Sequence, residues 1–234
     1  MGRFWITASG SGGTGKSSVS VGLAMTASGR GIKTLLLDAA GPYRTCDLYL
    51  GIQGTITIDL TDVLLNRLDT HTALYDVPGF AGFSYACTSL FSIVRLDEFS
   101  TLLLLLQGLF DLIIIDLPTG GLTLNPSFLK PEDQLILLTR PDPIACRACE
   151  MLSGQFRSIP AGISPIINFD DGRLRRKHLQ YSQDAVSQLL DLPILGVIPK
   201  DPDFFTLHAD GERIPGMSGR ERRLFETLCS ALLA

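Results

Sequence analysis

The chain has 234 residues, of which 45% are hydrophobic, and its formal net charge is −4 at pH 7. This length predicts one domain, residues 1–234, with a full core, and the charge excludes strong bulk attraction to nucleic acid or an anionic membrane. The five cysteines lack disulfide-framework spacing. No signal peptide precedes the first predicted strand, so we expect a cytoplasmic protein with free thiols.

The first motif lies between a predicted strand at residues 3–9 and a predicted helix at 17–28. Residues 10–17 read Gly-Ser-Gly-Gly-Thr-Gly-Lys-Ser, which fits the phosphate-binding P-loop pattern G-x-x-x-x-G-K-[ST]. In such a loop the backbone N–H groups, the lysine and the helix N-terminus bind phosphate, and the serine hydroxyl coordinates Mg²⁺. An ordinary glycine-rich turn is the alternative, but it does not require the Lys-Ser pair or the flanking elements. The predicted phosphate-binding residues are Gly10, Ser11, Gly12, Gly13, Thr14, Gly15, Lys16, Ser17 and Ser18.

The rest of the chain alternates apolar runs with helical patterns, which is typical of a parallel sheet wrapped by helices. Further strands are predicted at residues 33–38, 83–86, 112–116, 134–139, 163–168 and 194–198. Further helices are predicted at residues 58–66, 97–107, 143–157, 183–190 and 219–233. The predicted fold class is therefore α/β, a single P-loop NTPase domain with a mostly parallel sheet and helices on both faces.

A second motif is an apolar strand that ends in Asp116 and is followed by Leu-Pro-Thr-Gly120. A carboxylate at this position can hold Mg²⁺ through water, and the Gly120 N–H can sense a γ-phosphate. The alternative is an aspartate that only caps the next turn. Because a P-loop is present, we favour the first interpretation. Asp38 also ends a predicted strand, where ligands lie in open α/β sheets. We predict a catalytic set of Lys16, Asp38 and Asp116, and a metal-binding set of Ser17, Asp38 and Asp116.

Several segments resemble the MinD/ParA family of dimerising ATPases. Residues 33–51 resemble its second strand and first switch, and residues 116–120 its D-x-P-x-G motif. Thr139-Arg-Pro and residues 196–201 also have counterparts there, so the resemblance runs from residue 3 to about 230. Arg44, Asp47 and Gly51 in the switch place it closer to the MinD branch.

This resemblance implies binding of ATP or ADP with Mg²⁺ and a nucleotide-dependent positioning or division-related switch. It also implies that Asn168, Pro199 and Asp201 lie at the adenine. A homodimer and an unidentified protein partner are implied as well. A position at the inner face of the membrane is a further implication, although membrane and DNA contact are not favoured.

Two positions depart from the family pattern. Ser11 stands where the family has a signature lysine that reaches the partner's nucleotide, and Ala40 stands where it has the aspartate that orients the attacking water. Loss of such a cation removes on the order of 10³- to 10⁵-fold in rate, and loss of a positioned base on the order of 10²- to 10⁴-fold. We therefore expect ATP binding with weak hydrolysis. The alternatives are a pseudo-ATPase scaffold without turnover, and a P-loop transferase or ligase of the dethiobiotin-synthetase type, which also lacks the lysine.

Three weaker patterns have two interpretations each. Cys146 and Cys149 form a C-x-x-C, which is either an iron–sulfur ligand pair shared by a dimer or, as we favour, two buried helix cysteines. The basic residues at 173–178 are either a DNA contact or, as we favour, a solvated loop. The apolar stripe at 224–233 belongs either to a membrane-binding helix or, as we favour, to a packed final helix.

Overall fold

The computed structural model describes residues 2–41, 44–88, 96–120, 129–201 and 219–234. One sheet forms the centre of the fold, with eight strands in the order β3-β4-β2-β5-β1-β6-β7-β8. All its pairings are parallel except the antiparallel pair β3–β4. The strands are β1 Arg3–Ala8, β2 Thr34–Asp38, β3 Tyr75–Asp76, β4 Phe83–Cys87, β5 Leu112–Asp116, β6 Gln134–Thr139, β7 Gly162–Asp170 and β8 Gly196–Pro199.

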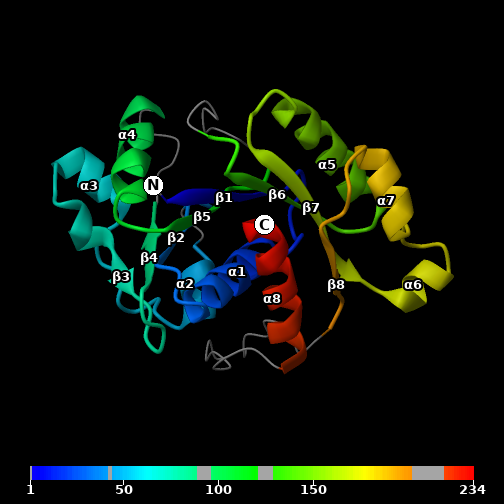
Figure 1. The fold of residues 1–234 in the computed structure, drawn as a ribbon, viewed down its shortest axis with the longest axis horizontal. Coiled ribbons are helices and arrows are strands. Elements are labelled where there is room, and N and C mark those ends of the chain that lie inside the picture. Colours follow the sequence, from blue (N-terminus) through cyan, green and yellow to red (C-terminus); the bar gives the residue numbers. More distant parts are fainter. Residues whose placement is uncertain (1, 42–43, 89–95, 121–128, 202–218) are drawn as a thin grey trace.

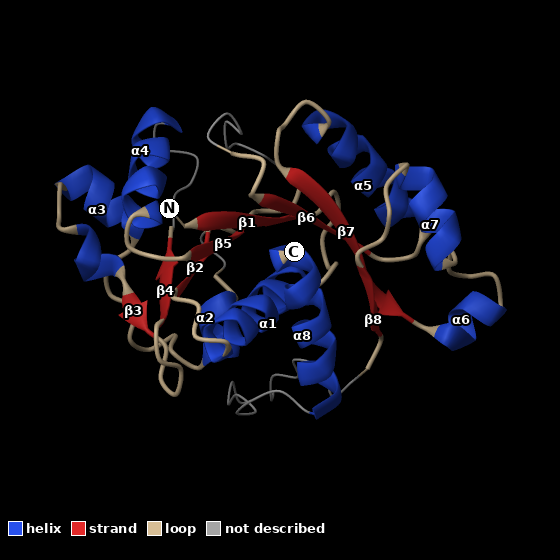
Figure 2. Ribbon diagram, viewed as in Figure 1, coloured by secondary structure: helices blue, strands red, loops and turns tan. Residues whose placement is uncertain are grey.

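Helices cover both faces of this sheet, as Figures 1 and 2 show. One face carries α1, α2 and α8, and the other carries α3, α4, α5 and α7. The helices are α1 Lys16–Gly29, α2 Cys46–Leu50, α3 Leu60–Asn66, α4 Leu96–Gln107, α5 Pro143–Phe156, α6 Gly172–Arg176, α7 Gln183–Leu190 and α8 Gly219–Leu233. The predicted α/β class and mostly parallel sheet are therefore confirmed.

Each central strand contributes to two cores. Ile113 and Ile115 of β5 pack on the side of α3, α4, α5 and α7, whereas Leu112 and Ile114 pack on the side of α1 and α8. A strand that is buried on both faces needs apolar residues at consecutive positions. This explains why the Leu-Ile-Ile-Ile run of β5 does not alternate with polar residues.

The structure contains short elements that periodicity did not predict. They are the two-residue strand β3, the five-residue helices α2 and α6, and a 3₁₀ turn at Thr70–Ala73. Elements of this length are too short for a recurring apolar pattern. Strand β7 also runs to Asp170 rather than ending at 168, and β8 begins at Gly196 rather than at 194.

The final helix α8 packs against α1 through its apolar stripe. Phe225, Leu228, Cys229 and Leu232 are at most 2% exposed, and a Cβ at Gly196 would lie 2.4 Å from a Leu228 methyl. The structure therefore agrees with the packed interpretation of this helix. No helix in the described ranges is long and apolar enough to cross a membrane.

The two cysteines of the C-x-x-C also lie in the core. Cys146 and Cys149 are fully buried within α5. Burial raises the pKa of the Cys146 thiol to about 11 and that of the Cys149 thiol to about 12. Their thiols cannot meet those of a second subunit at the surface, so the structure agrees with the buried-cysteine interpretation.

Candidate nucleotide and metal site

The P-loop connects the end of β1 to the start of α1. Gly13 and Gly15 have φ values of 68° and 79°, a left-handed conformation that favours glycine. A Cβ at Gly15 would lie 2.3 Å from the Asn168 amide nitrogen, so the loop also needs glycine in order to approach β7. Helix α1 begins at Lys16 with Gly15 as its N-cap. Its first N–H groups therefore have no capping side chain, an arrangement that suits a bound anion.

A cavity of about 250 Å³ opens over this helix N-terminus. Residues 13–18 of the loop form one wall, and Thr45, Leu48 and Tyr49 form the other. Lys16 lines this cavity and is mostly buried. The predicted phosphate-binding residues from Gly13 to Ser18 are thus brought together. Sequence reasoning did not predict the wall from α2, because a five-residue helix has no periodic signal.

Two aspartates lie next to the loop at the carboxyl ends of neighbouring strands. In the ladder of β2 and β5, Asp38 is paired in register with Asp116, and both side chains are fully buried. The Ser17 hydroxyl donates to Asp116 Oδ2 at 2.5 Å. Of the three predicted metal-binding residues, Ser17 and Asp38 therefore both lie next to Asp116.

Hydrogen bonds fix both carboxylates. Thr7 and Ser20 hydroxyls lie 3.1 and 3.2 Å from Asp116 Oδ1. Asp38 accepts backbone N–H bonds from Ala40, Thr45 and Cys46 at 3.1 to 3.2 Å. Burial, and then the charge of Asp116, raise the pKa of Asp38. Two buried, mutually repelling carboxylates beside a hydroxyl form a set of oxygen donors that suits a divalent cation such as Mg²⁺.

Sequence reasoning missed Cys46 in this cluster. Its sulfur lies 3.6 Å from Asp116 Oδ2, and the side chain is fully buried. Burial, and then the charges of Asp38 and Asp116, raise the pKa of the Cys46 thiol well above its usual value. The only available signal was its place in the first switch, eight residues after Asp38. Residues 42–43 of that switch lie outside the described residues.

The Gly120 N–H does not face the loop cavity in this structure. It donates to the backbone carbonyl of Ser9 at 3.0 Å, so a role in sensing a γ-phosphate requires this bond to break. Ser9 in turn donates its hydroxyl to the Ser11 carbonyl at 3.0 Å. Ser9, which follows β1, is thus hydrogen-bonded both to the P-loop and to the segment after β5.

The three residues predicted to lie at the adenine do gather at one place. Asn168, Pro199 and Asp201 line a cavity of about 30 Å³ together with Phe169 and residues of α1 and α8. This volume holds a water molecule but no purine ring. Phe169 has a left-handed φ of 59°, which is unusual for a bulky residue. Its ring lies against Gly15, a proximity that the sequence did not indicate.

Asn168 contacts the P-loop itself. Its amide nitrogen donates to the Thr14 carbonyl at 2.9 Å, and its oxygen accepts the Phe169 N–H at 2.9 Å. Asp201 receives a hydrogen bond from Arg220 of α8 at 3.3 Å. Asn168 therefore supports the P-loop in this structure, which is a role separate from any contact with adenine.

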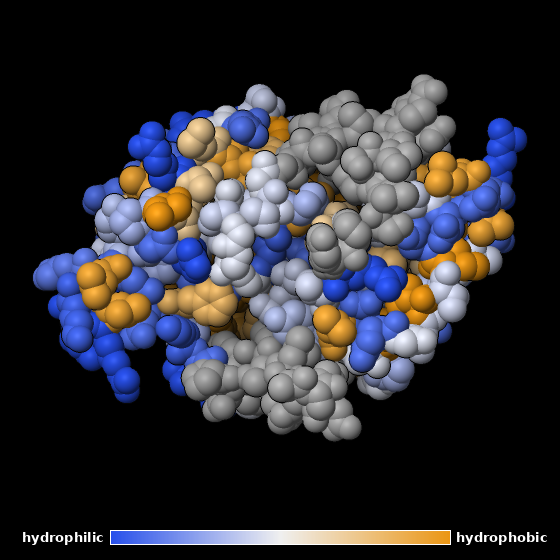
Figure 3. Space-filling view, turned by 180° about the vertical axis from the view of Figure 1, so that it is seen from behind, coloured by the Kyte–Doolittle hydropathy of each residue, from blue (hydrophilic) through white to orange (hydrophobic). Residues whose placement is uncertain are grey.

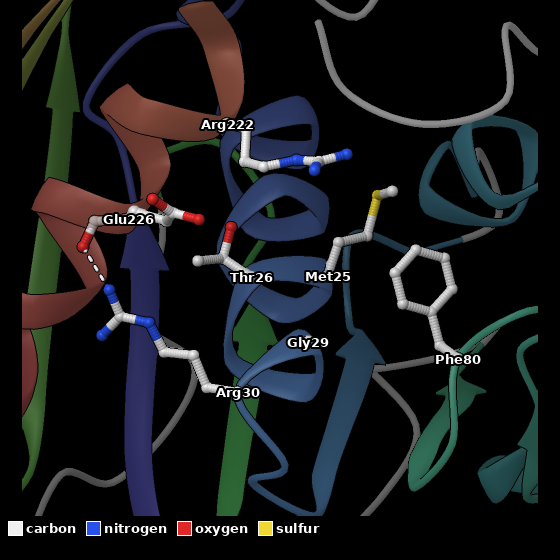
Figure 4. Close-up of a pocket in the computed structure, with 7 residues that line it drawn as sticks. All are labelled: Met25, Thr26, Gly29, Arg30, Phe80, Arg222 and Glu226. Atoms are coloured by element: carbon white, nitrogen blue, oxygen red, sulfur yellow. Dashed lines mark hydrogen bonds between the residues drawn. The ribbon is translucent and has the colours of Figure 1, made fainter. Parts of the chain in front are cut away.

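Another cavity, of about 290 Å³, lies at the opposite end of α1 (Figure 4). Met25 and Phe80 give it an apolar side, and Arg222 extends over it from α8. Arg30 donates to the Glu226 carbonyl at 2.6 Å. The negative end of the α1 dipole lies here and disfavours a phosphate, whereas the positive end lies at the P-loop. The P-loop cavity is therefore the phosphate site that the geometry supports.

A family model described as "CobQ/CobB/MinD/ParA nucleotide binding domain" matches residues 5–214. The chain belongs to this family. The MinD protein of Synechocystis sp. is 28% identical over 91% of this chain and 81% of that protein. The MinD protein of Bacillus subtilis is 27% identical over 92% of this chain and 82% of that protein.

Solved structures agree on the fold. The MinC:MinD complex of Aquifex aeolicus contains a chain with a TM-score of 0.83 at 20% identity, covering 99% of this chain and 95% of that chain. MinD of Pyrococcus horikoshii, solved with Mg-ADP, matches with a TM-score of 0.78 at 23% identity. This match covers 98% of this chain and 95% of that chain. The predicted MinD/ParA resemblance is confirmed for the whole P-loop ATPase fold.

The basic residues after β7 lie at the surface of the MinD/ParA fold. Arg173, Arg176 and Lys177 are exposed on and beside the short helix α6. Arg175 pairs with Asp170. On the rear face of the molecule, Figure 3 shows apolar groups interrupted by hydrophilic side chains. Both interpretations of residues 173–178, a solvated loop and a DNA contact, place these side chains at the surface, so the solvated loop stays a prediction.

Proposed function

We propose that this chain is an ATP-binding switch of the MinD/ParA type that hydrolyses ATP weakly. The observation that carries the proposal is the junction at the P-loop, where Ser17 donates to Asp116 at 2.5 Å and Asp38 lies in register beside it. In the described part of the chain, no carboxylate forms an ion pair with the Lys16 ammonium. That cation is thus available to a triphosphate.

In this proposal the loop N–H groups and Lys16 bind the phosphates of ATP or ADP. Ser17, Asp116 and Asp38 would hold Mg²⁺, and the ion would neutralise phosphate charge. The base is proposed to bind beside Asn168, Pro199 and Asp201, which line one cavity with Phe169.

Weak hydrolysis follows from what surrounds the expected attack position. Ser11 carries no charge, and the Ala40 methyl cannot orient a water. Two other carboxylates in the switch are already engaged. Asp38 accepts three backbone N–H bonds, and Asp47 is 2% exposed and pairs with Arg44 at 3.5 Å. Neither is free to replace the missing aspartate.

A pseudo-ATPase that binds partners without turnover is the second candidate, and Ser11 and Ala40 favour it as well. In both cases we propose a cytoplasmic protein with a protein partner and a homodimer. A MinD neighbour was solved as a complex with MinC, which supports a partner of this kind. The packed stripe of α8 makes membrane contact a less favoured proposal, and the net charge of −4 makes DNA contact a less favoured one.

Calorimetry with Mg-ATP and Mg-ADP tests nucleotide binding. Wild type should bind both, and Lys16→Ala should lose at least about 10²-fold in affinity while keeping its circular dichroism spectrum, because charged hydrogen bonds to phosphate are strong. Absence of binding to wild type at millimolar nucleotide would overturn the proposal. Phosphate release on the same samples separates the two candidates. A slow, Lys16-dependent rate indicates the switch, and no rate above buffer indicates the scaffold.

A further inference from the structure

A thiol shares the buried cluster at the end of β2 and β5. The ligand atoms of Asp38, Cys46 and Asp116 all lie within 4.8 Å of one another, and all three residues are fully buried. Among the described residues, this is the group of histidine, cysteine and acidic side chains that is close enough to hold a metal ion. The three ligands come from different segments: Asp38 from β2, Cys46 from α2 and Asp116 from β5.

One pair of donor atoms in this cluster has the spacing of two ligands on one metal ion. The Cys46 sulfur lies 3.6 Å from Asp116 Oδ2. Two ligands of a tetrahedral zinc, at about 2.3 Å for sulfur and about 2.0–2.2 Å for oxygen, lie about 3.6 Å apart. The Cys46 thiol donates a hydrogen bond to Asp116 at this distance, and once the thiol proton is lost the same spacing suits two ligands of a single ion.

The surrounding bonds hold these ligands in place. The Cys46 N–H donates to Asp38 Oδ2 at 3.1 Å, so the backbone of α2 and the β2 carboxylate are positioned together. Thr7 and Ser20 hydroxyls orient Asp116 through Oδ1, which leaves Oδ2 toward Ser17 and Cys46. Hydrogen bonds of this kind, made to the ligands of a metal ion, orient those ligands and raise their affinity for the ion. Ser17 and Thr45 line the 250 Å³ cavity beside the cluster, which provides a route of entry.

We propose that Asp38, Cys46 and Asp116 form a site for a thiophilic divalent cation of the Zn²⁺ class. Mg²⁺ prefers oxygen ligands only, whereas Zn²⁺ accepts thiolate and carboxylate together. Binding forms a metal–sulfur bond, and the thiol proton leaves to solvent. This inference deepens the metal part of the proposed function, but it requires neither nucleotide nor hydrolysis. Zinc in this site would compete with Mg²⁺ for the two aspartates.

The test uses the full chain, stripped with a chelator, and Co²⁺ as a spectroscopic probe of the zinc site. Wild type should bind one Co²⁺, with a near-ultraviolet thiolate charge-transfer band and visible bands of a low-coordinate ion, and Zn²⁺ should abolish both. Cys46→Ser should lose the charge-transfer band and weaken Zn²⁺ binding by at least about 10²-fold. A normal circular dichroism spectrum of this isosteric variant shows that the fold is intact.

A matched control separates this site from the other cysteines. The double variant Cys146→Ser with Cys149→Ser alters two thiols that pack on the opposite face of the sheet, and it should keep the charge-transfer band. The inference is overturned if wild type shows no such band, if Cys46→Ser keeps it, or if only the double variant loses it. Calorimetry with Mg-ADP on wild type tests the nucleotide proposal separately, so a negative cobalt result with normal Mg-ADP binding rejects only the zinc site.

Discussion

The amide nitrogen of Asn168 donates a 2.9 Å hydrogen bond to the backbone carbonyl of Thr14, which joins the end of β7 to the P-loop. Both residues are buried. This bond places Asn168 in support of the loop, whichever base the site accepts. It also explains why the loop lies so close to β7 that Gly15 cannot carry a Cβ.

Replacement of Asn168 should therefore weaken the binding of different nucleotides to a similar extent. Asn168→Ala leaves the Thr14 carbonyl without its donor, which costs about 1–3 kcal/mol, and loosens the loop. We expect Mg-ADP and Mg-GDP to lose affinity by similar factors in calorimetry. Asn168→Asp, which keeps an acceptor for Phe169 but loses the donor, should behave the same way. A loss confined to ADP would instead assign Asn168 to base recognition alone.

The backbone of Phe169 should store strain. A left-handed φ costs a residue with a Cβ roughly 1–2 kcal/mol relative to glycine. Phe169→Gly and Phe169→Ala both remove the ring, but only the first removes the Cβ. Glycine should therefore be more stable than alanine by about 1 kcal/mol in urea unfolding. Equal stabilities, or a more stable alanine variant, would show that position 169 is not strained.

The pair Asp38–Asp116 should destabilise the protein at neutral pH. Because the pKa of Asp38 is raised above 3.8 in the folded state, this carboxyl favours folding below a pH of about 4. That contribution is lost as the pH rises through the folded-state pKa. Asp116→Asn removes the repulsion, and the hydroxyls of Thr7, Ser17 and Ser20 can reorient around the amide. In chelator, this variant should gain on the order of 1–3 kcal/mol at pH 8.

Thermal melts from pH 4.5 to 8 measure this effect. The advantage of Asp116→Asn over wild type should shrink toward low pH, because protonation of Asp38 in wild type also removes the repulsion. Mg²⁺ should stabilise wild type more than the variant. A variant that melts below wild type at pH 8 would mean that the hydrogen bonds of the Asp116 carboxylate outweigh the repulsion.

Restoring the family residues at positions 11 and 40 should raise the rate of ATP hydrolysis. Ser11→Lys supplies a cation toward the partner's triphosphate, and Ala40→Asp supplies a group that can orient water. We expect the double variant to release phosphate at least about 10²-fold faster than wild type, with smaller gains in each single variant. Lys16→Ala in the double variant should abolish the gain. A wild-type rate already as fast as the double variant would show that another residue performs this role.

The missing lysine should also weaken ATP-driven dimerisation. Two triphosphates that face each other repel, and without a cation from each partner this repulsion grows as water is excluded. Light scattering of wild type should therefore show the same mass with no nucleotide, with ADP and with ATP and Mg²⁺. Ser11→Lys should strengthen the association of two subunits in the ATP sample. Tight dimerisation of wild type only with ATP and Mg²⁺, lost in Lys16→Ala, would mean that Ser11 or Arg44 replaces the lysine.

The sequence by itself determined the features that local patterns encode. The Gly-Lys-Ser spacing predicts the P-loop, and the apolar runs predict the central strands. Those runs also place Asp38 and Asp116 at strand ends. Each of these signals lies within a few consecutive residues, because backbone conformation and burial on both sheet faces constrain neighbouring positions directly.

Only the tertiary structure decided how those ends meet. The register of β2 against β5 sets Asp38 beside Asp116, and the position of α2 brings Cys46 to the same point. The approach of β7 joins Asn168 to Thr14 across 154 positions in the chain, and Gly120 donates to Ser9. These contacts depend on strand order and on packing between distant segments, which no local pattern in the sequence encodes.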